Sequence, residues 1–362
     1  MLWEQKVKNH FPDSHAEIHL GTILNNLRTI HKRAGTEKVF AVVKCDAYRH
    51  GAVRVSRHIE DAADWFGVAS VDEGIQLRMG GLKKPILVFN VPGYDTAAAY
   101  HTHNLTATVS HKTHFDTLMD GTRYQLNFDT GMGRFGFMPE DAADVRQLAV
   151  MNQRLSCSGI YSHYATADDP GSDFVRKQYE RFSNITELFK EIPLRHMSNT
   201  GAVANYDIGH FNMVRTGVGM LGYNSGEKRY DWLKPALTWK TRIVQIRKIK
   251  KETPVSYSST WKAPQEGYLA TIPVGYGDGI PRSLSNKLKV WIDGELYPQV
   301  GNVTMDNIMV FLGEKQLPAE TEVTLLGGEG WNAHDWAEKA GTNVHEILTN
   351  ITGRVEKIYG ES

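Results

Sequence analysis

The chain has 362 residues, enough for two domains or for one large barrel with an addition. Lysine and arginine together number 41, as do aspartate and glutamate, so no net charge attracts nucleic acid or an anionic membrane surface. Two cysteines are too few for a disulfide framework, and no apolar run approaches the roughly 20 residues of a membrane span. The N-terminus lacks the apolar core of a signal peptide, and we therefore expect a cytoplasmic protein without nucleic acid or a membrane as partner.

Short apolar segments and amphipathic segments alternate from about Ala16 to Gly222. This alternation predicts parallel strands joined by helices, and the number of units favours a (β/α)8 barrel over an open sheet. The apolar segments begin near residues 38, 65, 84, 106, 124, 155, 194 and 213. Helical patterns occupy residues 52–62, 71–81, 94–102, 111–121, 139–150 and 172–192.

The pattern changes after about Leu237. Strand-like segments separated by glycine or proline turns now dominate, and helical patterns return only at residues 332–341 and 344–351. We therefore predict two domains, a barrel at residues 1–235 and a mainly β domain at residues 236–362.

Chemistry-bearing residues stand near the ends of the predicted barrel strands, where barrel enzymes place their catalytic groups. They are Lys44, Asp129, His163, Asn199 and Arg215. Lys44 is the most informative of them because burial disfavours a charged lysine, which then needs a carboxylate partner, a lowered pKa or a covalent use. A lysine that extends its amine to solvent is the plain structural alternative. The covalent uses are an imine with a substrate carbonyl, as in a cofactor-free aldolase, or an imine with pyridoxal phosphate.

Two later segments favour the phosphorylated cofactor. "SNTGA" at residues 198–202 offers a hydroxyl, an amide and small residues after a strand, and "RTGVGMLGY" at residues 215–223 offers glycines near the last strands. Exposed backbone N–H groups in such segments bind phosphate, and barrels often bind one at this place.

Eight motifs together resemble the bacterial alanine racemases, in the order seen in that family. They are "AVVKCDAYRHG", "NFDTGMGRFGF", "GIYSHYATAD", "HMSNTGA", "VRTGVGMLGY", "VSYSSTWKA", "PVGYGDGIPRSLSN" and "VGNVTMDN". The resemblance covers nearly the whole chain and implies a pyridoxal-phosphate barrel with a C-terminal β domain. It also implies interconversion of L- and D-alanine, which supplies D-alanine for peptidoglycan.

The resemblance implies two acid–base groups on opposite faces of the substrate. Lys44 resembles the lysine that holds the cofactor as an imine, and Tyr257 resembles a tyrosine that the partner subunit supplies. Racemisation needs proton transfer at both faces of one carbon, which such a pair provides. A homodimer is therefore implied, with each β domain completing the partner's site.

Further roles follow from the same resemblance. Arg215 resembles the arginine that donates to the pyridine nitrogen, His163 the histidine beside the cofactor ring and His196 the histidine that contacts the arginine. Arginine can only donate, so that nitrogen stays unprotonated and the cofactor becomes a weaker electron sink. The phosphate-binding set is Tyr48, Ser198, Asn199, Thr200, Gly217 and Val218; Arg134 and Met305 are expected at the substrate carboxylate, with Asp306, Tyr276 and Arg282 nearby. An ordinary ion pair is the alternative for Arg134, Asp306 and Arg282.

The chain departs from the family pattern at several positions. Asn127 stands where many members have a carbamylated lysine that braces the arginine equivalent to Arg134, and we expect that chloride could replace the missing anion. Gly353 stands where a tyrosine is frequent, which could admit serine or longer side chains. Ser258, Ser259, Asn302 and Arg49 also differ from the usual residues.

Three related functions stay open at this point. A serine or broad-specificity racemase of the same fold is the nearest alternative. A fold-related decarboxylase lacks support because the sequence shows no cysteine-bearing substrate loop of that kind and Arg215 makes a strong electron sink unfavourable. A non-catalytic pyridoxal-phosphate carrier would resemble the barrel alone.

Overall fold

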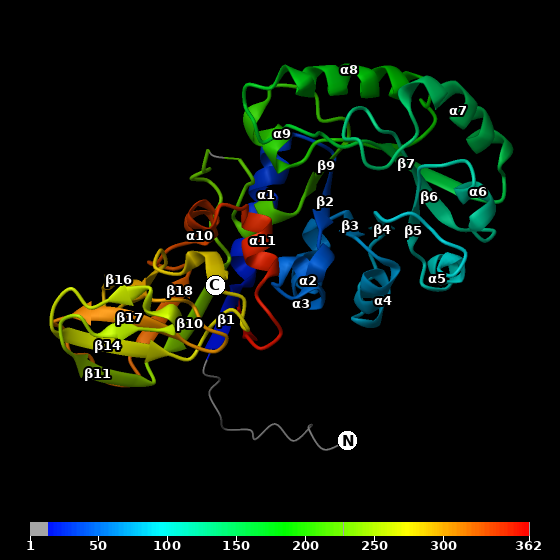
Figure 1. Ribbon diagram of the computed structural model, residues 1–362. Coiled ribbons are helices and arrows are strands. Elements are labelled where there is room, and N and C mark those ends of the chain that lie inside the picture. Colours follow the sequence, from blue (N-terminus) through cyan, green and yellow to red (C-terminus); the bar gives the residue numbers. More distant parts are fainter. Residues whose placement is uncertain (1–13, 227, 362) are drawn as a thin grey trace. The chain divides into compact units, whose positions relative to one another are not determined.

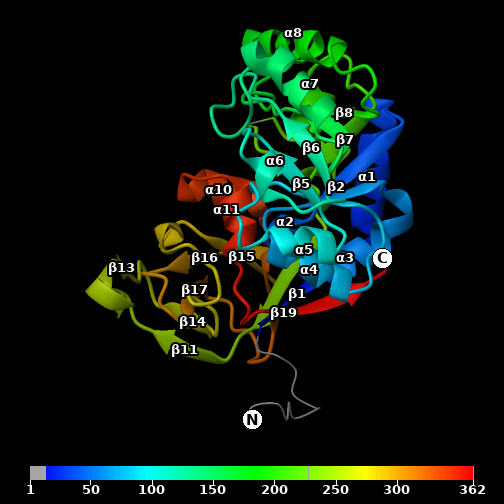
Figure 2. The ribbon, with the colours of Figure 1, turned by 90° about the vertical axis from the view of Figure 1, so that its right-hand side faces the viewer.

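The computed structural model describes residues 14–226 and 228–361. These residues form two compact units, one of residues 20–234 and one that combines residues 14–19 with residues 235–361 (Figures 1 and 2). Residues 1–13, for which the sequence predicts no signal peptide, lie outside the described part of the chain. Within the described part, no helix combines the length and the apolar character needed to cross a membrane.

The first unit is a closed barrel of eight parallel strands, which confirms the predicted fold class. Its strands are β2 (Lys38–Val42), β3 (Trp65–Val68), β4 (Ile86–Val88), β5 (Thr106–Val109), β6 (Arg123–Asn127), β7 (Ser156–Tyr161), β8 (Leu194–His196) and β9 (Met213–Thr216). Its right-handed α-helices are α1 (Leu20–Ala34), α3 (Ala52–Ile59), α4 (Val71–Met79), α5 (Ala97–Thr102), α6 (His114–Thr117), α7 (Ala142–Met151), α8 (Asp173–Glu187) and α9 (Thr200–Asn205). Helices α4 to α8 lie in an arc outside the strands (Figure 1).

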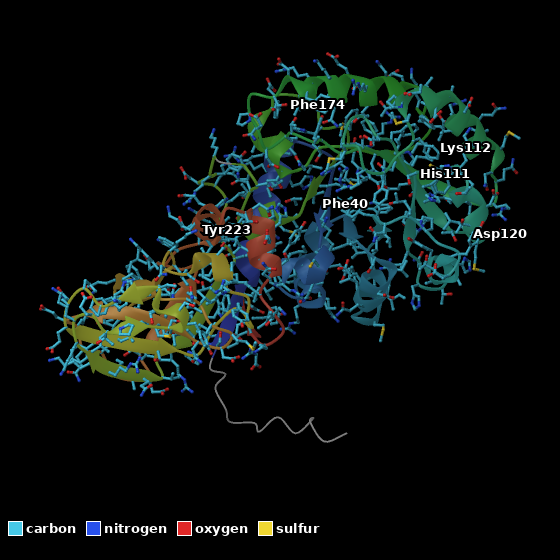
Figure 3. All side chains as sticks on the ribbon, in the orientation of Figure 1. Phe40, His111, Lys112, Asp120, Phe174 and Tyr223 are labelled. Carbon is cyan, nitrogen blue, oxygen red and sulfur yellow. The ribbon has the colours of Figure 1, made fainter. Side chains whose placement is uncertain are left out.

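The barrel strands contain short apolar segments, as expected of strands that are buried on both faces. All four residues of β3, β5 and β9 are buried, and Phe40 on β2 is fully buried (Figure 3). Phe40 packs in a cluster with Val42, Trp65, Leu87, Tyr161, Leu194 and Met213. Polar residues such as Gln125 and Thr108 are also buried in this interior.

The second unit is a nine-stranded, mainly antiparallel sheet in the order β11-β14-β17-β16-β15-β18-β10-β1-β19. Its strands are β1 (Ser14–His19), β10 (Leu237–Arg242), β11 (Gln245–Ile249), β14 (Gly267–Ile272), β15 (Lys289–Ile292), β16 (Glu295–Val300), β17 (Ile308–Gly313), β18 (Glu322–Leu326) and β19 (Glu356–Gly360). A separate pair is formed by β12 (Pro254–Val255) and β13 (Trp261–Lys262). Two helices, α10 (Ala333–Ala340) and α11 (Val344–Thr349), occur where the helical pattern returns in the sequence.

At the N-terminal end, the two compact units divide the chain differently from the predicted domains of residues 1–235 and 236–362. Strand β1 belongs to the second unit, where it pairs antiparallel with β10 and parallel with β19. Its burial alternates residue by residue, as in a strand with one covered and one open face, whereas the barrel strands β3, β5 and β9 are buried at every residue. Trp239 on β10 donates from Nε1 to Ser14 Oγ over 2.6 Å, which joins the two strands. The second boundary lies between residues 234 and 235.

Candidate active site

The carboxyl ends of the barrel strands bring the predicted barrel residues to one rim. Lys44 follows β2, Asp129 follows β6, His163 follows β7 and Asn199 follows β8, while Arg215 lies on β9 itself. In a closed parallel barrel these ends face the same side. Burial and then the charges of Arg215, Arg134 and Lys44 lower the pKa of His163, so all three cations act on the same imidazole.

Lys44 begins a short helical turn, α2 (Lys44–Tyr48), that is left-handed from its second residue. Cys45, Asp46, Ala47, Tyr48 and Arg49 all have φ between 51° and 67°. Burial and then the positive charge of Arg134 lower the pKa of Lys44, while Glu73 and Cys45 act in the opposite direction. A lysine whose neutral form is favoured is a better nucleophile toward a carbonyl.

Arg215 is held by five hydrogen bonds from its two terminal nitrogens. Nη1 donates to His196 Nδ1 over 2.7 Å and to the His196 carbonyl over 3.1 Å. Nη2 donates to His163 Nδ1 over 2.9 Å and to the carbonyls of Ser162 and Met197. Both histidines accept at Nδ1 and are therefore neutral. Nε donates to none of the described residues, so this N–H is left for a ligand.

The environment keeps Arg215 charged and the histidines neutral. Burial lowers the pKa of Arg215 to about 10, which still leaves the guanidinium protonated near neutral pH. Burial and the charge of Arg215 hold the pKa of His196 well below its ordinary value. His196 Nε2 is 2.7 Å from Gln125 Oε1, and because Nδ1 already accepts, Nε2 carries the proton that Gln125 accepts. Tyr161 stacks on His196 at 5.1 Å between ring centroids and lies 5.5 Å from the Arg215 guanidinium.

Gln125 and Tyr161 are site-supporting residues that the sequence analysis missed. Tyr161 Oη lies 2.9 Å from Thr108 Oγ1, and Gln125 and Thr108 are fully buried in the barrel interior. The local signal for Gln125 is a polar residue between Tyr124 and Leu126 in the buried part of β6. Polar residues in such a place are buried only with partners, and here the partner is a site histidine.

The predicted phosphate-binding residues form a tight cradle. A Cβ at Gly217 would lie 2.4 Å from Tyr48 Oη, and one at Gly219 would lie 2.3 Å from Thr200 Oγ1, so glycine alone fits at both positions. The backbone N–H groups of Thr200, Gly217 and Val218 donate to none of the described residues. Backbone N–H groups that have no protein acceptor are available to bind a phosphate.

Several members of the phosphate set already have protein partners, among them Thr200, whose Oγ1 lies 3.0 Å from Thr216 Oγ1. Ser198 Oγ lies 2.8 Å from His210 Nδ1, and Asn199 Oδ1 accepts from the N–H of Ala202 as the cap of α9. Their remaining hydrogen-bonding groups are the ones left for an anion.

Arg134 lies on the loop after β6, which Asp129 organises. Asp129 accepts from the backbone N–H groups of Gly131, Met132 and Arg134. Burial acts against the charged form, but these bonds together hold the pKa of Asp129 below its ordinary value. The Arg134 side chain is exposed and makes no hydrogen bond or ion pair with the described residues, while Asn127 Nδ2 donates to the Phe135 carbonyl over 3.0 Å. Within the described part of the chain, no carboxylate pairs with the Arg134 guanidinium.

Five predicted residues lie in the second unit. Tyr257 is 75% exposed and begins the turn η4 (Tyr257–Ser259); Met305 is 53% exposed and its N–H donates to no described residue. Tyr276 and Arg282 are also exposed. Asp306 forms an ion pair with Arg354, and the two charged groups are 2.9 Å apart. This contact is the ordinary ion pair that was the alternative to a site role for Asp306.

Arg354 and Asn302 support these loops, and the sequence analysis did not assign them a role. Arg354 also pairs with Asp278 at 3.2 Å, and Asp278 accepts from the N–H of Gly275, so one guanidinium joins the two loops that carry Tyr276 and Met305. Asn302 Nδ2 donates to the Tyr257 carbonyl over 2.9 Å, and its own carbonyl accepts from Ser256 Oγ.

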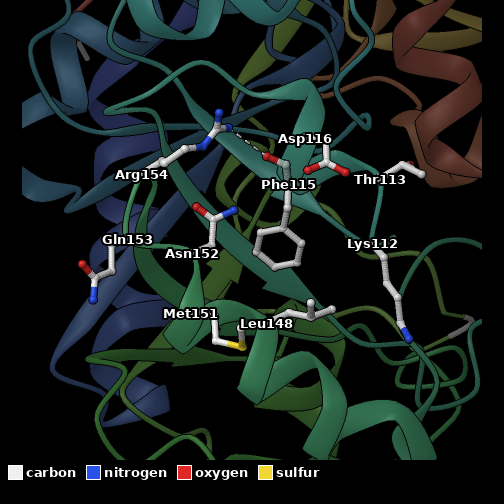
Figure 4. Close-up of a pocket in the computed structure, with 9 residues that line it drawn as sticks. All are labelled: Lys112, Thr113, Phe115, Asp116, Leu148, Met151, Asn152, Gln153 and Arg154. Atoms are coloured by element: carbon white, nitrogen blue, oxygen red, sulfur yellow. Dashed lines mark hydrogen bonds between the residues drawn. The ribbon is translucent and has the colours of Figure 1, made fainter.

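A separate surface cavity of about 450 Å³ contains none of the predicted site residues (Figure 4). It lies between α6 and the end of α7, and its wall includes Lys112, Asp116 and Asn152. Arg154 closes one side, where Nη2 donates to the Phe115 carbonyl and Nη1 pairs with Asp120 at 3.2 Å.

Comparisons with known proteins cover both units. The family model for the N-terminal domain of alanine racemase matches residues 18–225, and the model for the C-terminal domain matches residues 236–359. The alanine racemase of Cutibacterium acnes is 37% identical over 96% of this chain and 97% of its own. The crystal structure of alanine racemase from D-cycloserine-producing Streptomyces lavendulae has a TM-score of 0.88 at 31% identity, covering 97% of this chain and 98% of its own. The structure of alanine racemase from Bartonella henselae with covalently bound pyridoxal phosphate, 24% identical, has the same fold with a TM-score of 0.88 and covers 97% of this chain and all of its own.

Proposed function

The chain belongs to the alanine racemase family, and on this basis we propose that it interconverts L- and D-alanine with pyridoxal phosphate held at Lys44. The observation that carries the proposal is one rim that combines the Lys44 amine, the unused Nε–H of Arg215 and the unbonded N–H groups of the cradle. These three features match the aldehyde, the ring nitrogen and the phosphate of that cofactor in chemical character.

The residues present therefore fit the cofactor. Lys44 would hold it covalently through Nζ, Arg215 Nε would donate to the ring nitrogen, and the cradle of Tyr48, Ser198, Asn199, Thr200, Gly217 and Val218 would bind the phosphate, with His163 beside the ring. When bound, the cofactor supplies an electron sink for charge that develops on the α-carbon of the substrate.

Arg215 keeps this sink weak. Its guanidinium stays protonated because His196 and His163 accept from it in their neutral forms, so it can donate to the ring nitrogen but not protonate it. A weaker sink disfavours decarboxylation and transamination, which supports a racemase over a fold-related decarboxylase.

Proton transfer is proposed for two groups on opposite faces. Lys44 Nζ would move the proton on one face of the α-carbon, and Tyr257 Oη of a second copy of the chain would move it on the other. The exposure of Tyr257 in the single chain supports its use by a partner subunit. We accordingly propose a homodimer in which residues 236–362 complete the partner's site. The partner's Met305 N–H and this chain's Arg134 would bind the substrate carboxylate; Tyr276, Arg282 and Asp306 would line the substrate path.

Two departures from the family shape the proposed substrate site. Chloride beside Arg134 would supply the anion that Asn127 does not provide, and electron density between Asn127 and Arg134 in a crystal would support it. A Cβ at Gly353 would have nothing within 4 Å in its own unit, so a larger residue would fit there. This opening favours serine or broad-specificity racemisation as the second candidate. D-Alanine for peptidoglycan, made in the cytoplasm where the free thiols of Cys45 and Cys157 stay reduced, is the proposed product.

Deuterium exchange tests the proposed reaction. In D2O the full chain with pyridoxal phosphate should place deuterium on the α-carbon of both L- and D-alanine without releasing carbon dioxide. Lys44→Ala should lose both the visible absorbance of the bound cofactor and the exchange. Tyr257→Phe should lower exchange by about 10²–10⁴-fold from one enantiomer.

The matched control is Tyr268→Phe, which removes a phenol oxygen on β14 that bonds only to Gln316 among the described residues. Full-speed exchange in both directions by Tyr257→Phe would end the two-group assignment. Side-by-side assays of D-alanine and D-serine formation decide between the two substrates.

A further inference from the structure

Strands β2 and β3 are neighbours in the barrel (Figure 1). The carboxylate of Glu73 joins the segments that follow these two strands. Its Oε1 accepts from the N–H of Cys45 over 2.6 Å, and its Oε2 accepts from the N–H of Ala69 over 2.7 Å. The first of these amides is the peptide bond that follows Lys44. The carboxylate therefore binds directly to the backbone that carries the reactive amine.

At this peptide bond the backbone φ changes from negative at Lys44 to positive at Cys45. Lys44 has an ordinary negative φ, and the next five residues are left-handed, although none of them is glycine. Non-glycine residues resist this conformation because Cβ approaches the following carbonyl, so the segment needs anchors at both ends. At its far end Asp46 Oδ1 accepts from the N–H of Ala52 over 2.8 Å. Glu73 provides the near anchor.

Ordinary helix capping does not explain the contact. Glu73 is the third residue of α4, whose cap Ser70 accepts from the Glu73 N–H. In a capping box the Glu73 carboxylate would accept from the N–H of Ser70 itself. Instead it bonds one residue earlier, to Ala69, and reaches across to Cys45.

The charge of Glu73 also acts on the pKa of the Lys44 amine. Besides burial, the groups that act on this amine are the cation Arg134, the thiol of Cys45 and Glu73, while His163 lies close enough to feel the lysine charge. Glu73 favours the protonated form of Lys44, against burial and Arg134.

We propose that Glu73 is a positioning residue for Lys44, fixing the direction of its backbone and balancing its charge by binding the Cys45 and Ala69 amides. The proposal rests on the proposed function only in naming the reaction that the amine serves. The contacts of Glu73 with the Cys45 and Ala69 amides do not depend on that reaction.

The test compares Glu73→Gln with Asp72→Asn, a neutralising change at the adjacent exposed residue of the same helix. The first measurement is the pH dependence of Lys44 acylation by an amine reagent, on the full chain freed of cofactor, with the peptide followed by mass spectrometry. In Glu73→Gln the midpoint should move to lower pH, because the carboxylate that raises the pKa of Lys44 is gone. In Asp72→Asn it should stay at the wild-type position.

The second measurement is the kinetics of the loaded enzyme. Glu73→Gln should lower kcat for alanine by about tenfold to a hundredfold with little change in KM, because misplacement of a reacting group slows the chemical step. Glu73→Asp keeps the negative charge on a shorter side chain. It should therefore keep the wild-type midpoint of Lys44 acylation and still lower kcat. If Glu73→Gln does not fold, Glu73→Asp provides the kinetic test.

A wild-type midpoint and wild-type kcat in a folded Glu73 variant would overturn the proposal. Failure of the wild-type chain to racemise alanine would instead count against the proposed function, because the acylation midpoint is measured without cofactor or substrate.

Discussion

Buried polar residues in the barrel illustrate how single side chains set the chemistry of the rim. Arg215 is 4% exposed, and every group that accepts from it is a neutral histidine or a backbone carbonyl. A buried cation without a carboxylate partner is unfavourable unless dense hydrogen bonding replaces its water. The hydrogen bonds that offset the cost of burying Arg215 also fix the direction of its Nε–H, which donates to none of the described residues. This arrangement also makes the two histidines sensitive to acid.

The stability of the protein should therefore fall as the pH falls below about 6.5, the ordinary histidine value. The pKa of His196 and of His163 is lower in the folded chain than in the unfolded chain, so the unfolded chain binds more protons in this range. Stability from these groups is present above pH 6.5 and is lost below it. Urea unfolding at a series of pH values measures the effect.

The matched variant is His196→Asn, whose amide oxygen can still accept from Arg215. Its free energy of unfolding should fall less steeply with acidification than that of the wild type. Equal slopes would show that His196 already carries a proton in the folded chain.

Short left-handed segments are the elements that present the two proposed acid–base groups. Lys44 precedes one such segment, and Tyr257 lies in another, between Ser256 at φ 66° and Ser258 at φ 61°. Both segments are built from residues other than glycine and both are tied down by side chains, Glu73 in one case and Asn302 in the other. Strain held by surrounding contacts is a common property of functional sites.

Ser258→Gly should raise the free energy of unfolding by about 1 kcal/mol, because glycine adopts the left-handed conformation without the Cβ penalty. The Ser258 side chain is exposed, so few contacts are lost. The control is Ser283→Gly in the turn η5 (Arg282–Leu284), where φ is not positive and the change should destabilise by about 0.5–1 kcal/mol. Denaturant unfolding of both variants measures whether each change raises or lowers the free energy of unfolding. A loss of stability in Ser258→Gly would contradict the assignment of backbone strain to Ser258.

At the scale of the whole molecule, the N-terminal strand β1 belongs to the same unit as the C-terminal part of the chain. The two units therefore do not follow one another in the order of the sequence. Ile18 on β1 is fully buried and pairs with Leu237 and Tyr359, whereas Ile23 on α1, five positions later, is buried in the barrel unit. The second unit is therefore assembled from both ends of the chain, and the barrel is the uninterrupted stretch between them.

Ile18→Ala and Ile23→Ala form a matched pair that tests this division. Each should lower stability by about 2–5 kcal/mol through a cavity in a packed core. Hydrogen exchange should speed up in β10 and β19 for Ile18→Ala and in the barrel strands for Ile23→Ala. Faster exchange in the barrel alone for Ile18→Ala would contradict the assignment of β1.

The amino-acid sequence by itself determined the eight barrel strands, the change to a β-rich second domain and the place of Lys44, Arg215 and the cradle glycines near strand ends. These features are local, because apolar periodicity and turn residues act over a few positions. Only the tertiary structure decided where β1 pairs, since Ile18 meets Leu237 and no local pattern encodes so distant a partner. It alone also placed Gln125 of β6 against His196 of β8, and Glu73 of α4 against the amide after Lys44, because side chains on different elements become neighbours only when the barrel closes.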